Sequence, residues 1–277
     1  MDNSDSAIVA IVADTHINST VGLCPRRVKL DDGGTYHPSK GQRALWSAWL
    51  EFWESVFAQA TKIDAQVYAV INGDLNDLNV HDGTGLITKN RSDIIRMTVD
   101  ALEPVMAADH IFIIRGTEAH VGRRANLEEE VAKDLNTEPD AQAGTHSWWW
   151  LKLNAAGVLF DIAHHPQTFS RRPWTLDAAP NRHAAIIRDE YQERGEKVPD
   201  VAVRAHVHKY VPGNRRLKPQ FFYCFPWLLT TAHARRLGAT EFETIGGLVF
   251  TCQDSQYTFE PESWRPYALK RKIWSAP

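Results

Sequence analysis

Five short apolar runs, at residues 7–13, 67–71, 111–114, 158–163 and 201–203, constrain the fold of this chain more than any other feature. Each is rich in valine, isoleucine, alanine or phenylalanine and has the length of a β-strand that is buried on both faces. Between most of them, apolar residues recur at intervals of three and four, as on one face of a helix. Strands that alternate with helices predict an α/β fold.

The apolar spacing predicts helices over residues 41–62, 94–108, 126–135 and 181–194. Asp93 is expected to cap the second helix, and the glutamates at 128–130 are expected on a solvated face near the start of the third. Residues 147–153 and 158–163 flank a turn and predict a β-hairpin. Further strands are predicted at 221–225, at 247–252 and around Tyr257 and Phe259.

The chain has 277 residues, which is long enough for a sizeable core, and no repeat or linker divides it. We therefore expect one domain over 1–277, with a loop and helix insertion around 17–62 and a C-terminal tail from about 261. The net charge of −3 argues against a surface built to coat nucleic acid, although a local basic cleft is allowed. The oligomeric state cannot be read from the sequence.

Three cysteines are too few and too scattered for a disulfide framework or a thiolate zinc site. The first residues lack the basic segment of a signal peptide, and no apolar run is long enough to span a bilayer. We expect a soluble, cytoplasmic protein without a membrane partner.

Every apolar run is followed by acidic or imidazole side chains. The five clusters are Asp14/His16, Asp74/Asp77, Glu118/His120, His164/His165 and His206/His208. Each cluster alone has an ordinary explanation. Asp14 could cap a turn, and Gly73–Asp74 could simply form a turn. Together they suggest a site, because ligands of α/β proteins gather beyond the carboxyl ends of strands. His206 and His208 are expected to share one face of an extended chain.

Carboxylates and imidazoles without thiolates suit manganese, iron, zinc or nickel better than magnesium or calcium. The clusters hold enough ligands for two divalent ions, and a carboxylate such as Asp74 could bridge them. We expect two metal ions, with manganese as the first choice.

The order and spacing of these blocks over residues 8–210 resemble the calcineurin-like metallophosphoesterases, and in particular their small bacterial and phage-borne members. The matching blocks are Asp14-x-His16, Gly73-Asp74-x-x-Asp77, Gly116…His120, His164 and Ala205-His206-x-His208. The resemblance implies a two-layer β-sandwich flanked by helices, with a binuclear metal centre between strand ends.

The resemblance also implies roles for single residues. The first metal would be held by Asp14, His16 and His208, and the second by His164 and His206. Asp74 would bridge the two ions. His120 would lie near the leaving-group oxygen as a general acid or an electrostatic stabiliser.

The third block departs from the family pattern Gly-Asn-His-Asp/Glu, in which the asparagine binds the second metal. Here the block reads Gly116-Thr117-Glu118-Ala119-His120. Either Glu118 supplies the missing oxygen, or Thr117 takes the place of the asparagine and the ligand is lost. We favour Glu118, because a carboxylate is the better ligand for such cations.

Asp77 and His165 are expected beside the ligands rather than among them, in orienting or substrate contacts. The arginines at 115, 171 and 172 could contact phosphate. The tryptophans at 148–150 and at 174 could stack on bases, although packing on a core is the more ordinary role. The expected activity is hydrolysis of a phosphodiester in a nucleotide or nucleic acid by metal-activated hydroxide. A phosphomonoesterase, including a protein phosphatase, and a non-catalytic binding module are the alternatives.

Overall fold

Strand β1 (Ser6–Val12) lies inside the larger of two β-sheets and is buried along its whole length. Its side chains alternate between two cores, as the period of a strand requires. Ile8 and Val12 pack into the core beneath the helices, whereas Val9 and Ile11 pack into the core between the two sheets. The computed structural model describes residues 6–78, 85–166, 178–229 and 244–265.

The larger sheet has six strands in the order β13-β12-β1-β4-β5-β6. Strands β1, β4, β5 and β6 run parallel, so their carboxyl ends meet at one edge, while β12 and β13 are antiparallel to their neighbours. The bounds of the five further strands are β4 (Gln66–Asn72), β5 (His110–Ile114), β6 (Ser147–Trp148), β12 (Ile245–Gln253) and β13 (Gln256–Trp264).

The smaller sheet has five strands in the order β10-β11-β9-β8-β7. Its members are β7 (Leu151–Ala155), β8 (Val158–Ile162), β9 (Val201–Arg204), β10 (Val211–Pro212) and β11 (Gln220–Tyr223). Strands β8 and β9 are parallel neighbours, so their ends also lie side by side. A separate two-stranded hairpin, β2 (Val28–Lys29) and β3 (Thr35–Tyr36), lies between β1 and β4 in the sequence.

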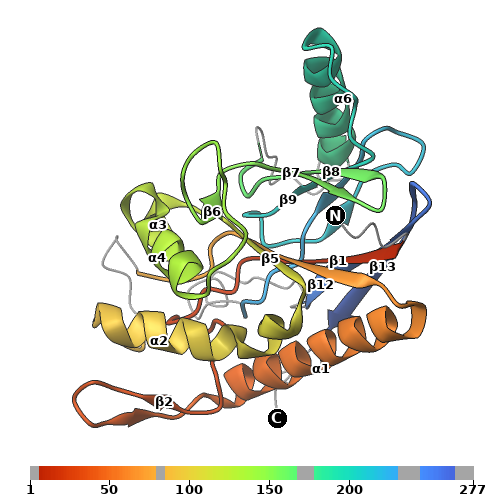
Figure 1. Ribbon diagram of the computed structural model, residues 1–277. Helices are drawn as coiled ribbons and strands as arrows, with labels where there is room; N and C mark the ends of the chain where they lie inside the picture. Colours follow the sequence, from red (N-terminus) through yellow and green to blue (C-terminus); the bar gives the residue numbers. More distant parts are fainter. Residues whose placement is uncertain (1–5, 79–84, 167–177, 230–243, 266–277) are drawn as a thin grey trace, which may run out of the picture.

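Helices cover the outer faces of both sheets, which gives the expected sandwich flanked by helices (Figure 1). Helix α1 (Lys40–Ile63) and helix α2 (Arg91–Leu102) pack on the larger sheet, and helix α6 (Ala178–Glu193) packs on the smaller one. The shorter helices α3 (Glu118–Val121), η2 (Arg123–Ala125) and α4 (Asn126–Asp134) follow β5. In the described parts of the chain, no helix is both long enough and apolar enough to cross a membrane.

Two details of the predicted elements are wrong. The segment 147–153 is not one hairpin strand, because β6 pairs with β5 in the larger sheet while β7 pairs with β8 in the smaller one. Helix α2 ends at Leu102 and continues as the 3-10 helix η1 (Glu103–Ala107), and its cap is Asn90 rather than Asp93. Strand β13 runs through Pro261 as far as Trp264, and residues 266–277 of the expected tail lie outside the described residues.

Candidate metal centre

The polar clusters lie in turns at the carboxyl ends of five strands, and backbone hydrogen bonds join several of these turns. Asp14 donates its N–H to the carbonyl of Gly73 at 3.0 Å, and His16 donates to the carbonyl of Asp74 at the same distance. Ala205 donates its N–H to the carbonyl of His164 at 2.9 Å. Hydrogen bonds thus join the turn after β1 to the turn after β4, and the turn after β8 to the turn after β9.

One group of possible ligands comprises Asp14, His16, Asp74 and His208, whose ligand atoms all lie within 4.8 Å of one another. His208 Nε2 lies 3.3 Å from Asp14 Oδ1 and 3.2 Å from His16 Nε2. Two carboxylates and two imidazoles form a donor set that suits a divalent transition metal.

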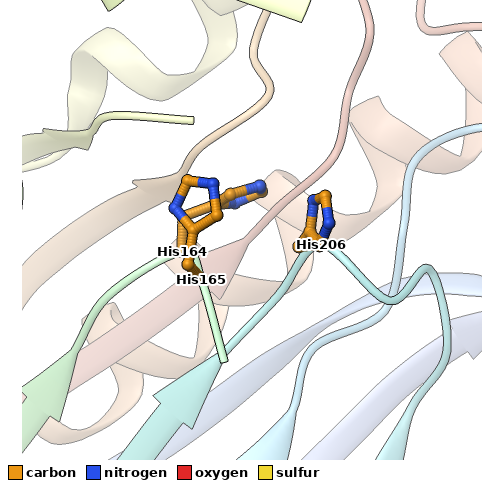
Figure 2. Close-up of side chains that lie close together, drawn as sticks. All are labelled: His164, His165 and His206. Carbon is orange, nitrogen blue, oxygen red and sulfur yellow. The ribbon is translucent and has the colours of Figure 1, made fainter. Parts of the chain in front are cut away.

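A second group comprises His164, His165 and His206, whose ring nitrogens also lie within 4.8 Å of one another (Figure 2). Asp74 reaches toward this group as well, because its Oδ2 lies 3.1 Å from His164 Nε2 and 3.7 Å from His206 Nδ1. The Asp74 carboxylate therefore lies between the two groups.

Asp77 and His120 form a third group with His16. Asp77 lies between the two imidazoles, with its carboxylate oxygens 3.5 Å from His120 Nδ1 and 3.9 Å from His16 Nδ1. These separations suit ion pairs better than hydrogen bonds. The His120 side chain is 33% exposed, so it borders the cluster instead of lying inside it.

Five of the candidate ligands have left-handed backbone conformations. Their φ angles are 52° for Asp14, 44° for His16, 47° for Asp74, 69° for His206 and 52° for His208. Each such conformation costs about 1–3 kcal/mol in a residue other than glycine, and strain of this kind gathers at functional sites. The expectation that His206 and His208 share a face of an extended chain is wrong, because β9 ends at Arg204 and both histidines lie in the bend that follows.

Three buried polar atoms without hydrogen-bond partners indicate whether these residues fit a cation. Asp14 Oδ1, Asp74 Oδ2 and His164 Nε2 are buried and have no hydrogen-bond partner. His164 Nδ1 lies 2.7 Å from the carbonyl oxygen of Asn72 and must be its donor, so in the neutral ring Nε2 presents a lone pair toward Asp74 Oδ2. A metal-binding histidine is commonly held in this way by a backbone carbonyl. Cations bound in the two groups of ligands would satisfy all three atoms, and the residues therefore fit them.

The charges of the site point to the same conclusion. Burial raises the pKa of the Asp74 carboxyl, but the nearby His164, His206 and His16 together outweigh burial and hold the pKa below its usual value. Burial lowers the pKa of His164, but Asp74, Asp14 and the carbonyl of Asn72 together outweigh burial and raise this pKa to about 9. Burial and His208 lower the pKa of His16 to about 4. The carboxylates stay charged and attract positive charge, whether a proton or a metal ion.

The turn after β5 places Thr117, and not Glu118, beside Asp74. Thr117 donates its backbone N–H and its hydroxyl to Asp74 Oδ1, at 2.6 and 2.7 Å. Glu118 is exposed, and its Oε1 accepts the N–H of Arg124 at 3.0 Å. Among the described residues, Glu118 belongs to none of the three groups. The position of Glu118 therefore does not support its preferred assignment as a metal ligand, because its carboxylate accepts the N–H of Arg124 in its own loop.

Arg115 is not directed at the cluster. Its guanidinium donates to Ser147 Oγ at 2.8 Å, pairs with Glu129 at 3.3 Å and lies 5.0 Å from the centre of the Trp149 ring. Among the tryptophans, Trp148 packs against the core between the sheets, while Trp149 and Trp150 are 48% and 39% exposed. The arginines at 171 and 172 and the tryptophan at 174 lie outside the described residues.

Glu128 lies in a position that the sequence did not predict. It was expected on a solvated helix face, but it is fully buried and accepts the N–H groups of Leu75 at 3.0 Å and Gly116 at 2.6 Å. Burial raises the pKa of its carboxyl to about 7, although the two N–H groups favour the charged form. Its helical spacing to the buried Val131 and Ala132 was a signal for the inner face.

Comparisons with known proteins give distant likenesses of overall structure alone. No protein-family model and no curated protein match the chain. Among solved structures, vacuolar protein sorting 29 from Cryptosporidium parvum is 12% identical, with 94% of this chain and 98% of that chain covered and a TM-score of 0.37. Sulfate thiohydrolase SoxB from Thermus thermophilus, solved with glycerol, is 10% identical, with 94% of this chain and 56% of that chain covered and a TM-score of 0.44. Scores this low assign no function to the chain.

Proposed function

We propose that this protein is a single-domain, metal-dependent phosphoesterase that uses two divalent cations, in the manner of the calcineurin-like metallophosphoesterases that its motifs resemble. The observation that carries the proposal is the position of Asp74. This buried carboxylate lies between two groups of ligands, with Oδ1 held by Thr117 and Oδ2 unpaired near His164 and His206. A carboxylate held in this way is suited to bridging two ions.

The first cation would be held by Asp14, His16 and His208, the second by His164 and His206, and both by Asp74. The donor set suits manganese, iron, zinc or nickel. Bound divalent cations would activate water and offset the charge of a phosphoryl group.

His120 is the residue that we assign to the leaving group. It lies beside the first group of ligands, with its ring centre 4.5 Å from that of His16. It is partly exposed, so a bound phosphoester could reach it, and Asp77 holds its Nδ1 side. In this position His120 would give a proton to the departing oxygen, or stabilise its charge.

A phosphodiester in a nucleotide or nucleic acid is our first choice of substrate, and a phosphomonoester, including a phosphoprotein, is the second. One observation favours a non-catalytic binding module instead. The third sequence block brings a threonine to Asp74 and turns Glu118 away, so one expected ligand is lost. Retention of the other clusters supports the enzyme.

The test combines elemental analysis of the purified protein with hydrolysis of bis-p-nitrophenyl phosphate and p-nitrophenyl phosphate in added Mn²⁺. About two metal ions per chain with diester turnover would support the phosphodiesterase. Turnover of the monoester alone would favour the phosphatase. Absence of both metal and turnover would favour the binding module.

Asp74→Asn should abolish turnover while the fold is retained, because the amide cannot replace a shared carboxylate. Asp100→Asn, a matched change at an exposed position on α2, should leave turnover unchanged. Full activity of Asp74→Asn would refute the bridging role.

A further inference from the structure

We propose that His165 is a third imidazole ligand of the second cation, together with His164 and His206. This inference rests on the proposed function, since it concerns one of its two metal ions. His165 was expected only in an orienting or substrate contact.

The first support is the approach of the three ring nitrogens. They lie within 4.8 Å of one another. Nitrogens that bind one ion at about 2.1 Å lie within about 4 Å of one another, so only a small adjustment would be needed. The ring centre of His165 lies 5.0 Å from that of His164 and 5.4 Å from that of His206.

The second support is the local backbone. Neighbouring residues of an extended chain point to opposite faces, so consecutive histidines in a strand could not readily serve one ion. Strand β8 ends at Ile162, however, and His164 and His165 lie in a bend. The bend brings both rings to the loop that carries His206, as Figure 2 shows. The hydrogen bond from the N–H of Ala205 to the carbonyl of His164 holds these two loops together.

The third support is the number of ligands. Without His165, the second cation would have Asp74 Oδ2, His164 and His206. Neither Glu118 nor Thr117 adds a ligand, because Glu118 accepts the N–H of Arg124 and the hydroxyl of Thr117 donates to Asp74 Oδ1. With His165 the set becomes three nitrogens and one oxygen, which is the number of ligands in a tetrahedral site.

The two cations would then differ in their surroundings. The first would have two carboxylates and two imidazoles, whereas the second would have three imidazoles and a single carboxylate oxygen. Imidazole suits zinc, nickel and iron, while carboxylate oxygens suit manganese. We infer that the second site prefers zinc, nickel or iron to manganese, and that His165 is the cause of that preference.

Zinc titration by calorimetry of the metal-free protein tests the assignment. Wild-type protein should bind two Zn²⁺ per chain, and His165→Ala should weaken one of them at least tenfold and leave the other unchanged. His110→Ala is the matched control, because His110 is also partly exposed but pairs with Glu138. Manganese titration of the same variants should show a smaller loss for His165→Ala.

A second variant allows contact between residue 165 and the metal to be detected by absorption. In His165→Cys, stoichiometric Cd²⁺ should produce thiolate-to-metal charge-transfer absorption, which an added His206→Ala should weaken. The wild-type protein should show none, because its three cysteines are buried, and His110→Cys should not show it at stoichiometric Cd²⁺.

The outcomes separate this inference from the proposed function. Two zinc ions bound equally well by wild type and His165→Ala, with no absorption in His165→Cys, would overturn the role of His165 and leave the binuclear site intact. A wild-type protein that binds no metal would overturn both.

Discussion

Thr117 donates two hydrogen bonds to a single oxygen of Asp74, from its backbone N–H at 2.6 Å and from its hydroxyl at 2.7 Å. The pair of bonds fixes the carboxylate, so that its other oxygen faces His164 Nε2 at 3.1 Å. Thr117 thus orients the carboxylate that lies between the two groups of ligands.

Thr117→Val should lower metal affinity about 10–100-fold, the usual effect of removing a group that orients a metal ligand. Valine keeps the shape of threonine and the backbone N–H, so only the hydroxyl bond is lost. Calorimetric titration with Mn²⁺ or Zn²⁺ measures the effect. Thr61→Val, on the exposed surface of α1, is the control and should bind metal as wild type does. Equal affinities in the two variants would show that the hydroxyl does not orient Asp74.

Glu128→Gln should destabilise the fold by about 1–3 kcal/mol, because glutamine has one acceptor oxygen for two buried N–H groups. Its amide group would face the N–H of Leu75 or Gly116, donor against donor. Metal affinity should fall as well, because these residues adjoin Asp74 and Thr117. Urea unfolding at about pH 8, where the carboxyl with its raised pKa is charged, measures the change.

The control for Glu128 is Glu130→Gln on the same helix, where the side chain is 46% exposed and pairs with Arg91. An exposed pair of this kind contributes about 0–1 kcal/mol. A free energy of unfolding in Glu128→Gln equal to that of Glu130→Gln would mean that the two turns do not depend on the buried carboxylate.

The strands could be predicted from the sequence because they are buried on both faces. Strand β1 is apolar without interruption for this reason, and the turn after it could be recognised from the polar residues alone. The resemblance to a known family then led to the two-layer arrangement, since no local pattern specifies which strands share a sheet. The splitting of 147–153 between two sheets shows that limit.

The fine structure of the site could not be predicted, because it depends on backbone turns. Strand periodicity placed His206 and His208 on one face, but both have left-handed φ angles that redirect their side chains. Ligand chemistry favoured Glu118 over Thr117, whereas loop geometry decides which of them reaches Asp74. A position near the start of a helix favoured a solvated Glu128, although its partners come from two turns that are distant in sequence.

The native protein should resist thiol reagents. Burial raises the pKa of Cys24 and of Cys252 to about 12, and burial also raises the pKa of Cys224. A raised thiol pKa leaves almost no thiolate near neutral pH, and the thiolate is the reactive form. Ellman's reagent at about pH 8 should therefore label no cysteine in the folded protein and all three after unfolding in guanidinium. Rapid labelling of one thiol in the folded protein would contradict the burial of that residue.

Gly73→Ala should remove metal binding through His164. Gly73 has a φ of +76°, and a Cβ placed on it would lie 2.3 Å from His164 Nδ1, so the imidazole would have to leave its position beside Asp74. Gly144→Ala is a closely matched control, because its φ is +67° but a Cβ there meets nothing within 4 Å.

Both alanine variants should carry a similar penalty of about 1–2 kcal/mol for a left-handed alanine. Gly73→Ala should add about 1–3 kcal/mol for overpacking, and it alone should lose affinity for the cation that His164 would bind. Urea unfolding and zinc titration of the two variants measure both effects. If the variants lose equal stability and bind zinc equally well, the contact between Gly73 and His164 does not position the imidazole, and the bond from His164 Nδ1 to the carbonyl of Asn72 must hold the ring alone.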